Sequence, residues 1–142
     1  MAIDTSNFSG AEILNQVLVD YKVQVIFCIT GAGNLAIVDA ITSQNKIKII
    51  YQHHEQACVM AAQAYSRITG KLGVALVTTG GGTSNAMTGI LSANLDSDEV
   101  LIIAGNESSF HCITPAPMRS YGVQGFDAQT AINPIAKESW RV

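Results

Sequence analysis

The chain has 142 residues, of which 48% are apolar and only 13% are charged, and its formal net charge is −3. This composition is typical of one globular domain with a single core, and it excludes a disordered chain. The eight Lys and Arg residues are scattered, which argues against a nucleic-acid-binding surface. The low charge content indicates that a partner covers part of the surface.

Residues 1–9 lack the basic start and apolar run of a secretory signal, and no apolar stretch approaches the ~20 residues of a membrane span. The three cysteines, Cys28, Cys58 and Cys112, are odd in number and widely spaced. We therefore expect reduced thiols in a cytoplasmic protein.

Predicted helices and strands alternate along the first half of the chain. Ser9 and Glu12 have the spacing of a capping box, which predicts the start of a helix. The apolar, β-branched run at 23–29 predicts a buried strand. In chain order we expect a helix from Ser9 to about Tyr21, the strand at 23–29, a turn at 30–34, a short helix at 35–43 and a second strand at 47–51.

The second half of the chain continues the alternation. An Ala-rich stretch from Glu55 to Thr69 is followed by Gly70, which suits the C-cap of a helix. After it we expect a strand at 73–77, a Gly-rich loop at 79–85, a helix at 86–95, a strand at 100–104, an irregular segment at 106–121, a short helix ending near Asn133 and a strand-like end at 139–142.

These elements predict an α/β fold with an open, mostly parallel, doubly wound sheet and helices on both faces. Binding sites in such sheets lie beyond the carboxyl ends of the strands. Residues 31–34, 53–56 and 79–85 each follow a predicted strand, so we expect them to converge on one site.

Two glycine motifs leave alternatives open. Gly31-x-Gly33-x-x-Ala36 fits a dinucleotide fingerprint with Glu55 as its acidic partner, but it also fits a plain tight turn. Residues 79–85 are rich in glycine but lack the Gly-Lys-Ser/Thr ending of a P-loop. Because adjacent glycines cost chain entropy, we favour a close approach of a ligand or another backbone over a flexible turn.

The sequence does not predict a metal site. Residues 53–58 lack the His-Glu-x-x-His spacing of a zinc site, and His111 with Cys112 is an isolated pair. Glu55 stands out because it joins a strand to a helix. A carboxylate there is usually stabilised by the helix dipole alone, whereas an apolar cleft would suit it to share a proton with a ligand. The pattern does not choose between these two interpretations.

Five stretches fit one pattern when they are taken together. They are VIFCITGAG at 25–33, HEQ at 54–56 with AAQAYSR at 61–67 and TGK at 69–71, GVALVTTGGGTSN at 73–85, TGI at 88–90 with Asp96-Ser97 and Gly105, and QGF at 124–126 with PIAK at 134–137. In this order and spacing they resemble the N-terminal, aminopyrimidine-binding domain of acetolactate-synthase-like thiamine-diphosphate enzymes. The resemblance covers residues 10–142.

The resemblance implies a single domain over residues 1–142 and a cofactor, thiamine diphosphate, bound between two domains. Glu55 would hydrogen-bond the ring nitrogen N1′ and favour the imino tautomer, whose exocyclic nitrogen takes the proton from C2. The resulting ylide would attack a 2-keto acid and release carbon dioxide, as in a lyase or transferase. The resemblance also implies that Gly31, Ala32, Gly33, Thr79, Gly80, Gly81 and Asn85 line the cofactor site and that Gln124 and Phe126 lie towards the substrate.

The sequence departs from the family pattern at four positions. Pro is common in the family at Thr30, Gly81 and Glu99, and Gln is common at Asp127. A different carboligation, or a simple decarboxylation, therefore stays open beside the synthesis of acetolactate.

The family's diphosphate and magnesium motif, Gly-Asp-Gly followed by Asn-Asn, has no counterpart because the chain contains no Gly-Asp-Gly. The resemblance thus implies that the central and diphosphate-binding domains, with the Mg²⁺ ligands and any FAD, lie outside this chain. The chain would then be truncated or one subunit of a split enzyme, inactive alone, and homo-oligomeric. A dinucleotide-binding module and a non-catalytic oligomerisation domain are the alternatives.

Overall fold

The computed structural model describes residues 7–108, 110, 111 and 117–142. Four strands form one fully parallel sheet in the order β2-β1-β3-β4. The strands are β1 (Val25–Cys28), β2 (Lys48–Tyr51), β3 (Gly73–Val77) and β4 (Val100–Ala104). The helices are α1 (Gly10–Asp20), α2 (Leu35–Gln44), α3 (Glu55–Thr69), α4 (Gly81–Leu95) and α5 (Ala128–Ile132), with a 3₁₀ turn η1 (Ala32–Asn34).

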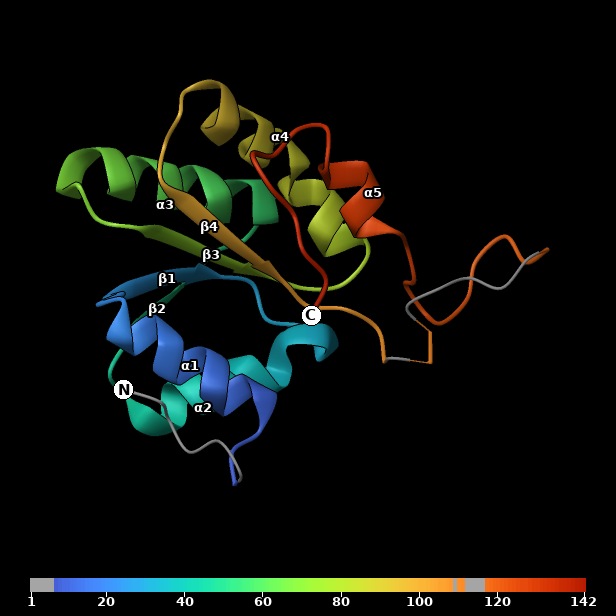
Figure 1. The fold of residues 1–142 in the computed structure, drawn as a ribbon, viewed down its shortest axis with the longest axis horizontal. Helices are drawn as coiled ribbons and strands as arrows, with labels where there is room; N and C mark the ends of the chain where they lie inside the picture. The colour runs from blue at the N-terminus through green and yellow to red at the C-terminus, as the bar shows by residue number, and fades with distance from the viewer. Residues whose placement is uncertain (1–6, 109, 112–116) are drawn as a thin grey trace.

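Helices cover both faces of the sheet. Helices α1 and α2 lie on one face, and α3, α4 and α5 lie on the other (Figure 1). Side chains that alternate along β1 enter two separate cores, with Ile26 facing α1 and α2 and Phe27 facing α3 and α4. All five residues of β3 are buried, as expected for a central strand with helices on both sides. The predicted doubly wound α/β fold is confirmed.

Local signals in the sequence account for the ends of two helices. Ser9 Oγ accepts a hydrogen bond from the Glu12 backbone N–H, and the Glu12 carboxylate accepts one from the Ser9 N–H, so the predicted capping box forms. Gly70 ends α3 with a left-handed φ of 62°. Helix α3 therefore has the predicted bounds.

The prediction of a loop at 79–85 is wrong in its second part, because α4 begins at Gly81 and not at Ala86. Gly80, with a φ of 59°, makes the turn out of β3. Glycine is normally unfavourable inside a helix, and packing against α3 explains the glycines at 82 and 89, which contact Glu55 and Val59. A Cβ on Gly89 would lie only 2.6 Å from Cβ of Val59, so the absence of a side chain lets the two helices approach closely.

A second prediction, of a strand at the end of the chain, is also wrong. The strand-like end expected at 139–142 has no strand conformation, and within the described residues β4 is an edge strand. A hydrogen bond from the Gln129 side chain to the backbone oxygen of Ser139 (3.2 Å) ties this end to α5. Of the irregular segment predicted at 106–121, residues 109 and 112–116 lie outside the described residues, and they include Cys112.

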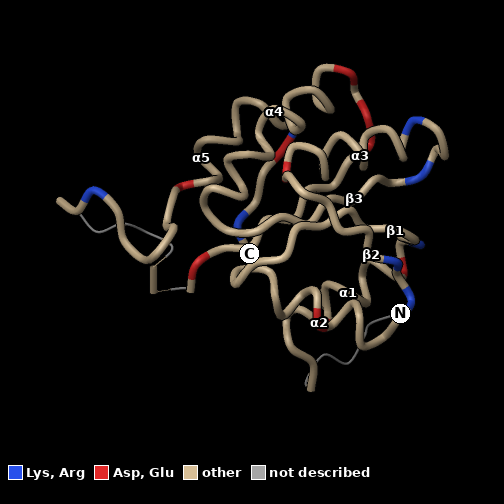
Figure 2. The backbone as a smooth tube through the Cα atoms, turned by 180° about the vertical axis from the view of Figure 1, so that it is seen from behind, with Lys and Arg blue, Asp and Glu red and all other residues tan. Residues whose placement is uncertain are grey.

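Charged side chains are sparse and dispersed over the fold. Lys and Arg occur on several separate elements, and they do not gather into one stripe (Figure 2). In the part of the chain that the structure describes, no helix is both long and apolar enough to cross a membrane.

Candidate active site at the carboxyl ends of the strands

Glu55 is the first residue of α3, where the chain turns back from the carboxyl end of β2. Its relative exposure is only 8%, although it is a carboxylate. The turn before it is held by a hydrogen bond from the Gln52 N–H to the Cys28 carbonyl oxygen (2.9 Å), and His54 Nδ1 caps the helix by accepting from the Gln56 N–H (3.2 Å). The fold thus places a largely buried acid at the edge where sites in parallel sheets form.

The surroundings of the Glu55 carboxylate are polar on one side and close-packed on another. Asn85 Nδ2 on α4 donates a hydrogen bond of 3.0 Å to Glu55 Oε2. An added Cβ on Gly82 would lie 3.0 Å from Glu55 Oε1 and 2.7 Å from Thr78 Cγ2. Glu55 therefore sits between the first turn of α4 and the end of β3, 30 residues away in the sequence from its amide partner.

The three segments expected to converge do so, and glycines make the contact possible. A Cβ on Gly31 would overlap the Thr78 side chain, and a Cβ on Gly33 would overlap Thr79 Oγ1. Asn34, which is fully buried, closes the first turn because its Oδ1 accepts from the Gly31 N–H at 2.9 Å. Packing between protein segments therefore accounts for the glycines at 31 and 33.

Gly81 differs from its neighbours in the triple-glycine stretch. A Cβ on Gly80 would lie 2.6 Å from Cβ of Gln124, and Gly82 faces Glu55, but an added Cβ on Gly81 would meet nothing within 4 Å. Gly81 is thus the position in this stretch where the first turn of α4 faces open space.

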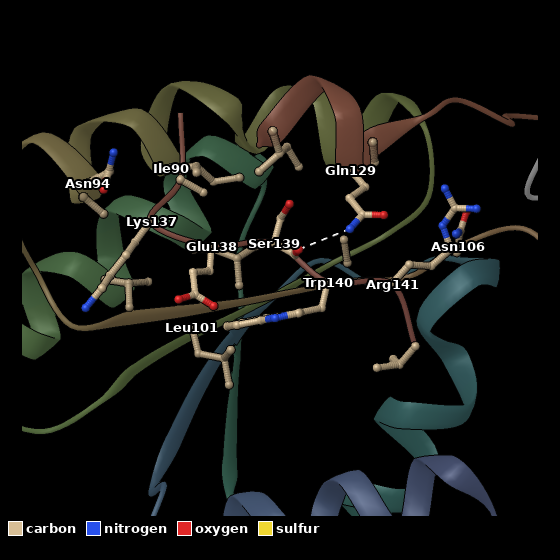
Figure 3. Close-up of a pocket in the computed structure, with 18 of the residues that line it drawn as sticks. Ile90, Asn94, Leu101, Asn106, Gln129, Lys137, Glu138, Ser139, Trp140 and Arg141 are labelled. Atoms are coloured by element: carbon tan, nitrogen blue, oxygen red, sulfur yellow. Dashed lines mark hydrogen bonds between the residues drawn. The ribbon is translucent and has the colours of Figure 1, made fainter. Parts of the chain in front are cut away.

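The two residues expected on the substrate side have different surroundings. Gln124 lies against Gly80, and its backbone N–H donates to Glu107 Oε1 (2.8 Å). Phe126 instead lines a cavity of about 630 Å³ along the outer edge of β4. No sequence pattern predicted this cavity, whose walls include Leu101 of β4 and Trp140 near the end of the chain (Figure 3). Glu55 does not line it.

The cysteines near Glu55 do not supply a reactive thiol. Burial, assisted by the neighbouring Cys28 and Glu55, raises the pKa of Cys58 to about 12, and burial raises the pKa of Cys28 to about 11. Both are free thiols, and these shifts keep them protonated at neutral pH. Among the described residues, no group of three or more His, Cys, Asp or Glu side chains could hold a metal ion.

Residues 8–128 match the protein family described as "Thiamine pyrophosphate enzyme, N-terminal TPP binding domain". The chain belongs to this thiamine pyrophosphate enzyme family. Similar proteins are the acetolactate synthase large subunit of Buchnera aphidicola, 45% identical over 101 residues, and that of Haemophilus influenzae, 46% identical over 101 residues. Each of these alignments covers 71% of this chain and 18% of the relative.

A third similar protein aligns over more of the chain. The acetolactate synthase of Bacillus subtilis is 39% identical over 133 residues, which are 94% of this chain and 22% of that protein. The chain therefore spans about one fifth of the length of these acetolactate synthases. The matched residues 8–128 contain both Glu55 and Asn85. They do not include residues 136–142, which line part of the cavity along β4.

Proposed function

We propose that this chain is the cofactor-activating domain of a thiamine-diphosphate-dependent enzyme that decarboxylates or ligates 2-keto acids, as acetolactate synthase does. The observation that carries the proposal is the Glu55 carboxylate, which is 8% exposed, stands at the carboxyl ends of the strands and faces the first turn of α4. A buried acid with few hydrogen-bond partners is costly unless a ligand uses it.

The residues around Glu55 fit an aminopyrimidine ring. A carboxylate is the acceptor that a ring N–H requires, and the absence of a side chain at Gly81 leaves open space in front of the first turn of α4. Glu55 would hold the ring at N1′, while Gly81 and Gln124 would border the space in front of α4. When bound, thiamine diphosphate would supply the electron sink that stabilises a carbanion after decarboxylation.

The contribution of this chain is the placement and protonation of one carboxylate. The Glu55 side chain would hold a proton shared with N1′, and the surrounding segments at 31–34 and 78–83 would exclude water from that hydrogen bond. One wall of the site would be formed by Gly31, Ala32, Gly33 and Thr79. The two glycines pack directly against Thr78 and Thr79. Gly80 would contribute indirectly, because its positive φ makes the turn that leads from β3 into α4.

The dinucleotide alternative finds no support in the same geometry. A pyrophosphate needs open backbone at Gly31 and Gly33, but Thr78 and Thr79 fill the space next to both glycines, and the Gly31 N–H is already bonded to Asn34. A purely structural oligomerisation domain would not need a nearly buried acid at this edge. Both observations favour the thiamine-diphosphate proposal.

The site is open beside Gly81, because an added side chain there would meet nothing within 4 Å, and Glu55 does not line the cavity along β4. We therefore propose that a diphosphate-binding domain, from the same or a second polypeptide, covers it and supplies the Mg²⁺ ligands. We further propose a symmetric homo-oligomer in the cytoplasm, with FAD possible only in the full enzyme. Sedimentation equilibrium of the chain at micromolar concentration should show a dimer or larger species, and a monomer would contradict this assembly.

Exchange of the cofactor C2 proton tests the role of Glu55. In the holoenzyme, Glu55→Gln should retain cofactor binding but slow this exchange by orders of magnitude, because an amide cannot share a proton as a carboxylate does. NMR in deuterated water measures the rate. The matched control is Glu99→Gln, which removes the same charge at an exposed position before β4. Near-normal exchange in Glu55→Gln would refute the proposed function.

A further inference from the structure

The Glu55 carboxylate has a single protein donor within the described residues. That donor is Asn85 Nδ2, at 3.0 Å from Oε2, and no described residue donates a hydrogen bond to Oε1. A carboxylate can accept about four hydrogen bonds. One oxygen is therefore held by the protein, and the other keeps its lone pairs for a ligand.

Asn85 has no evident structural reason to be asparagine. It lies on the exposed side of α4, in the second turn, where asparagine is a poor helix former. The bond to Glu55 is the only side-chain hydrogen bond that it makes among the described residues. The contact with the buried acid is therefore what the asparagine side chain contributes at this exposed helix position.

Holding Oε2 has a consequence for the geometry of the acid. The glutamate side chain has three rotatable bonds, and Gly82 packs closely against Oε1, because an added Cβ there would lie only 3.0 Å from this oxygen. Without a donor at Oε2, the carboxylate could rotate away from α4 and towards solvent. With the donor in place, the plane of the carboxylate is fixed between α3 and α4 before any ligand arrives.

We propose that Asn85 is a positioning residue for Glu55: its amide anchors Oε2 and so directs the remaining acceptor sites of the carboxylate at the aminopyrimidine ring. This inference rests on the proposed function of Glu55. It differs from a general pocket-wall role because it assigns the amide to the acid and not to the cofactor.

The first test needs no cofactor. In the 142-residue chain, the side-chain NH₂ of Asn85 gives a pair of ¹H–¹⁵N NMR signals, which are identified by their loss in Asn85→Asp. In Glu55→Ala these signals should move towards the positions typical of a solvent-exposed amide, for which Asn94 on the same helix is the internal reference. Unchanged Asn85 signals would overturn the inference, because the hydrogen bond would then not exist in solution.

The second test separates positioning from binding in the holoenzyme. Asn85→Ala should slow C2 proton exchange about tenfold to a hundredfold, the range expected for losing one hydrogen bond to a charged group, with little change in cofactor Kd. Asn85→Gln keeps the amide and should restore part of the rate. Asn85→Asp, which has nearly the same shape but no donor and a like charge, should be the slowest.

The control and the outcomes distinguish this inference from the proposal on which it rests. Asn94→Ala removes the same residue type from α4 away from Glu55 and should exchange at the normal rate. Slow exchange in Glu55→Gln together with normal exchange in Asn85→Ala would overturn the role of Asn85 alone. Loss of cofactor affinity in Asn85→Ala without a change in exchange would make Asn85 a binding residue instead.

Discussion

Helices α3 and α4 are joined by polar contacts at both ends, and the two ends are built differently. At the start of the pair, one hydrogen bond from Asn85 reaches the Glu55 carboxylate. At the far end, Gln63 donates to Asp98 at 2.7 Å and to Asp96 at 3.2 Å. Arg67 Nε donates to both Asp98 oxygens, at 2.9 and 2.8 Å, and Arg67 also pairs with Asp96.

The difference separates a contact that stabilises the fold from one that serves chemistry. At the far end the carboxylates of Asp96 and Asp98 meet a guanidinium and an amide, so each charge is compensated. At the start, a less exposed carboxylate has one neutral donor. Functional sites are among the places where natural folds depart from full compensation of a polar group. We therefore assign stability to the far end and function to the start.

The largest effect on stability is expected midway between the two ends. A Cβ on Gly89 would lie 2.6 Å from Cβ of Val59, a stiff β-branched residue that cannot move aside cheaply. Gly89→Val should therefore force α3 and α4 apart and lower the free energy of unfolding by about 3 kcal/mol. Urea unfolding followed by circular dichroism measures the loss.

The neighbouring position supplies the control for Gly89→Val. Thr88→Val places the same side chain at an exposed site one residue earlier and should change stability by no more than about 0.5 kcal/mol. Equal losses in the two variants would show that valine is unfavourable in α4 for a reason other than contact with Val59.

A smaller, pH-dependent effect is expected at the far end. Hydrogen bonds from Arg67, and then from Gln63, hold the pKa of Asp98 below its usual range. A depressed carboxyl pKa contributes stability above the unfolded value of about 3.9, and this contribution is lost as the pH falls through the lower folded pKa. Asp98→Asn should thus unfold more easily than the parent chain at pH 7, and the gap should close below about pH 4.

Thermal unfolding between pH 3 and pH 7 measures that gap. Asp39→Asn, which removes the same charge from an exposed position on α2, controls for net charge. In the holoenzyme, Asp98→Asn should leave C2 proton exchange unchanged. Slowed exchange would contradict our assignment of stability alone to the far end, because it would show that the far end also sets the position of Glu55.

The sequence predicted the secondary structure better than it predicted the polar contacts between α3 and α4. Alternating apolar runs and the Gly70 cap were sufficient for the sheet, for both bounds of α3 and for the convergence of three segments. The start of α4 was missed because three glycines are typical of a loop. Only the tertiary contacts of Gly80 with Gln124, and of Gly82 with Glu55 and Thr78, account for two of them. The hydrogen bond from Asn85 to Glu55, and the cluster formed by Gln63 with Asp98, join residues 30 and 35 positions apart, which no local pattern reveals.

The smallest effect on stability is expected at Gly81. A substitution there should lower cofactor affinity while leaving the free energy of unfolding almost unchanged. An added side chain meets nothing within 4 Å, and Gly81 does not have a positive φ. Gly81→Val should change the free energy of unfolding by no more than about 0.5 kcal/mol. It should nevertheless weaken thiamine-diphosphate binding to the holoenzyme at least about tenfold, because the valine would occupy the open space that we assign to the ring.

Gly82→Ala is the matched comparison for this prediction, since its methyl group would lie 2.7 Å from Thr78 Cγ2 and 3.0 Å from Glu55 Oε1. It should cost about 1 kcal/mol of stability and slow C2 exchange by displacing the acid. Calorimetry with Mg²⁺ and thiamine diphosphate, together with thermal unfolding of each variant, distinguishes the two glycines. If Gly81→Val destabilised the fold without a selective loss of binding, the triple-glycine stretch would serve only to pack α4 against α3. The space in front of Gly81 would then need another explanation.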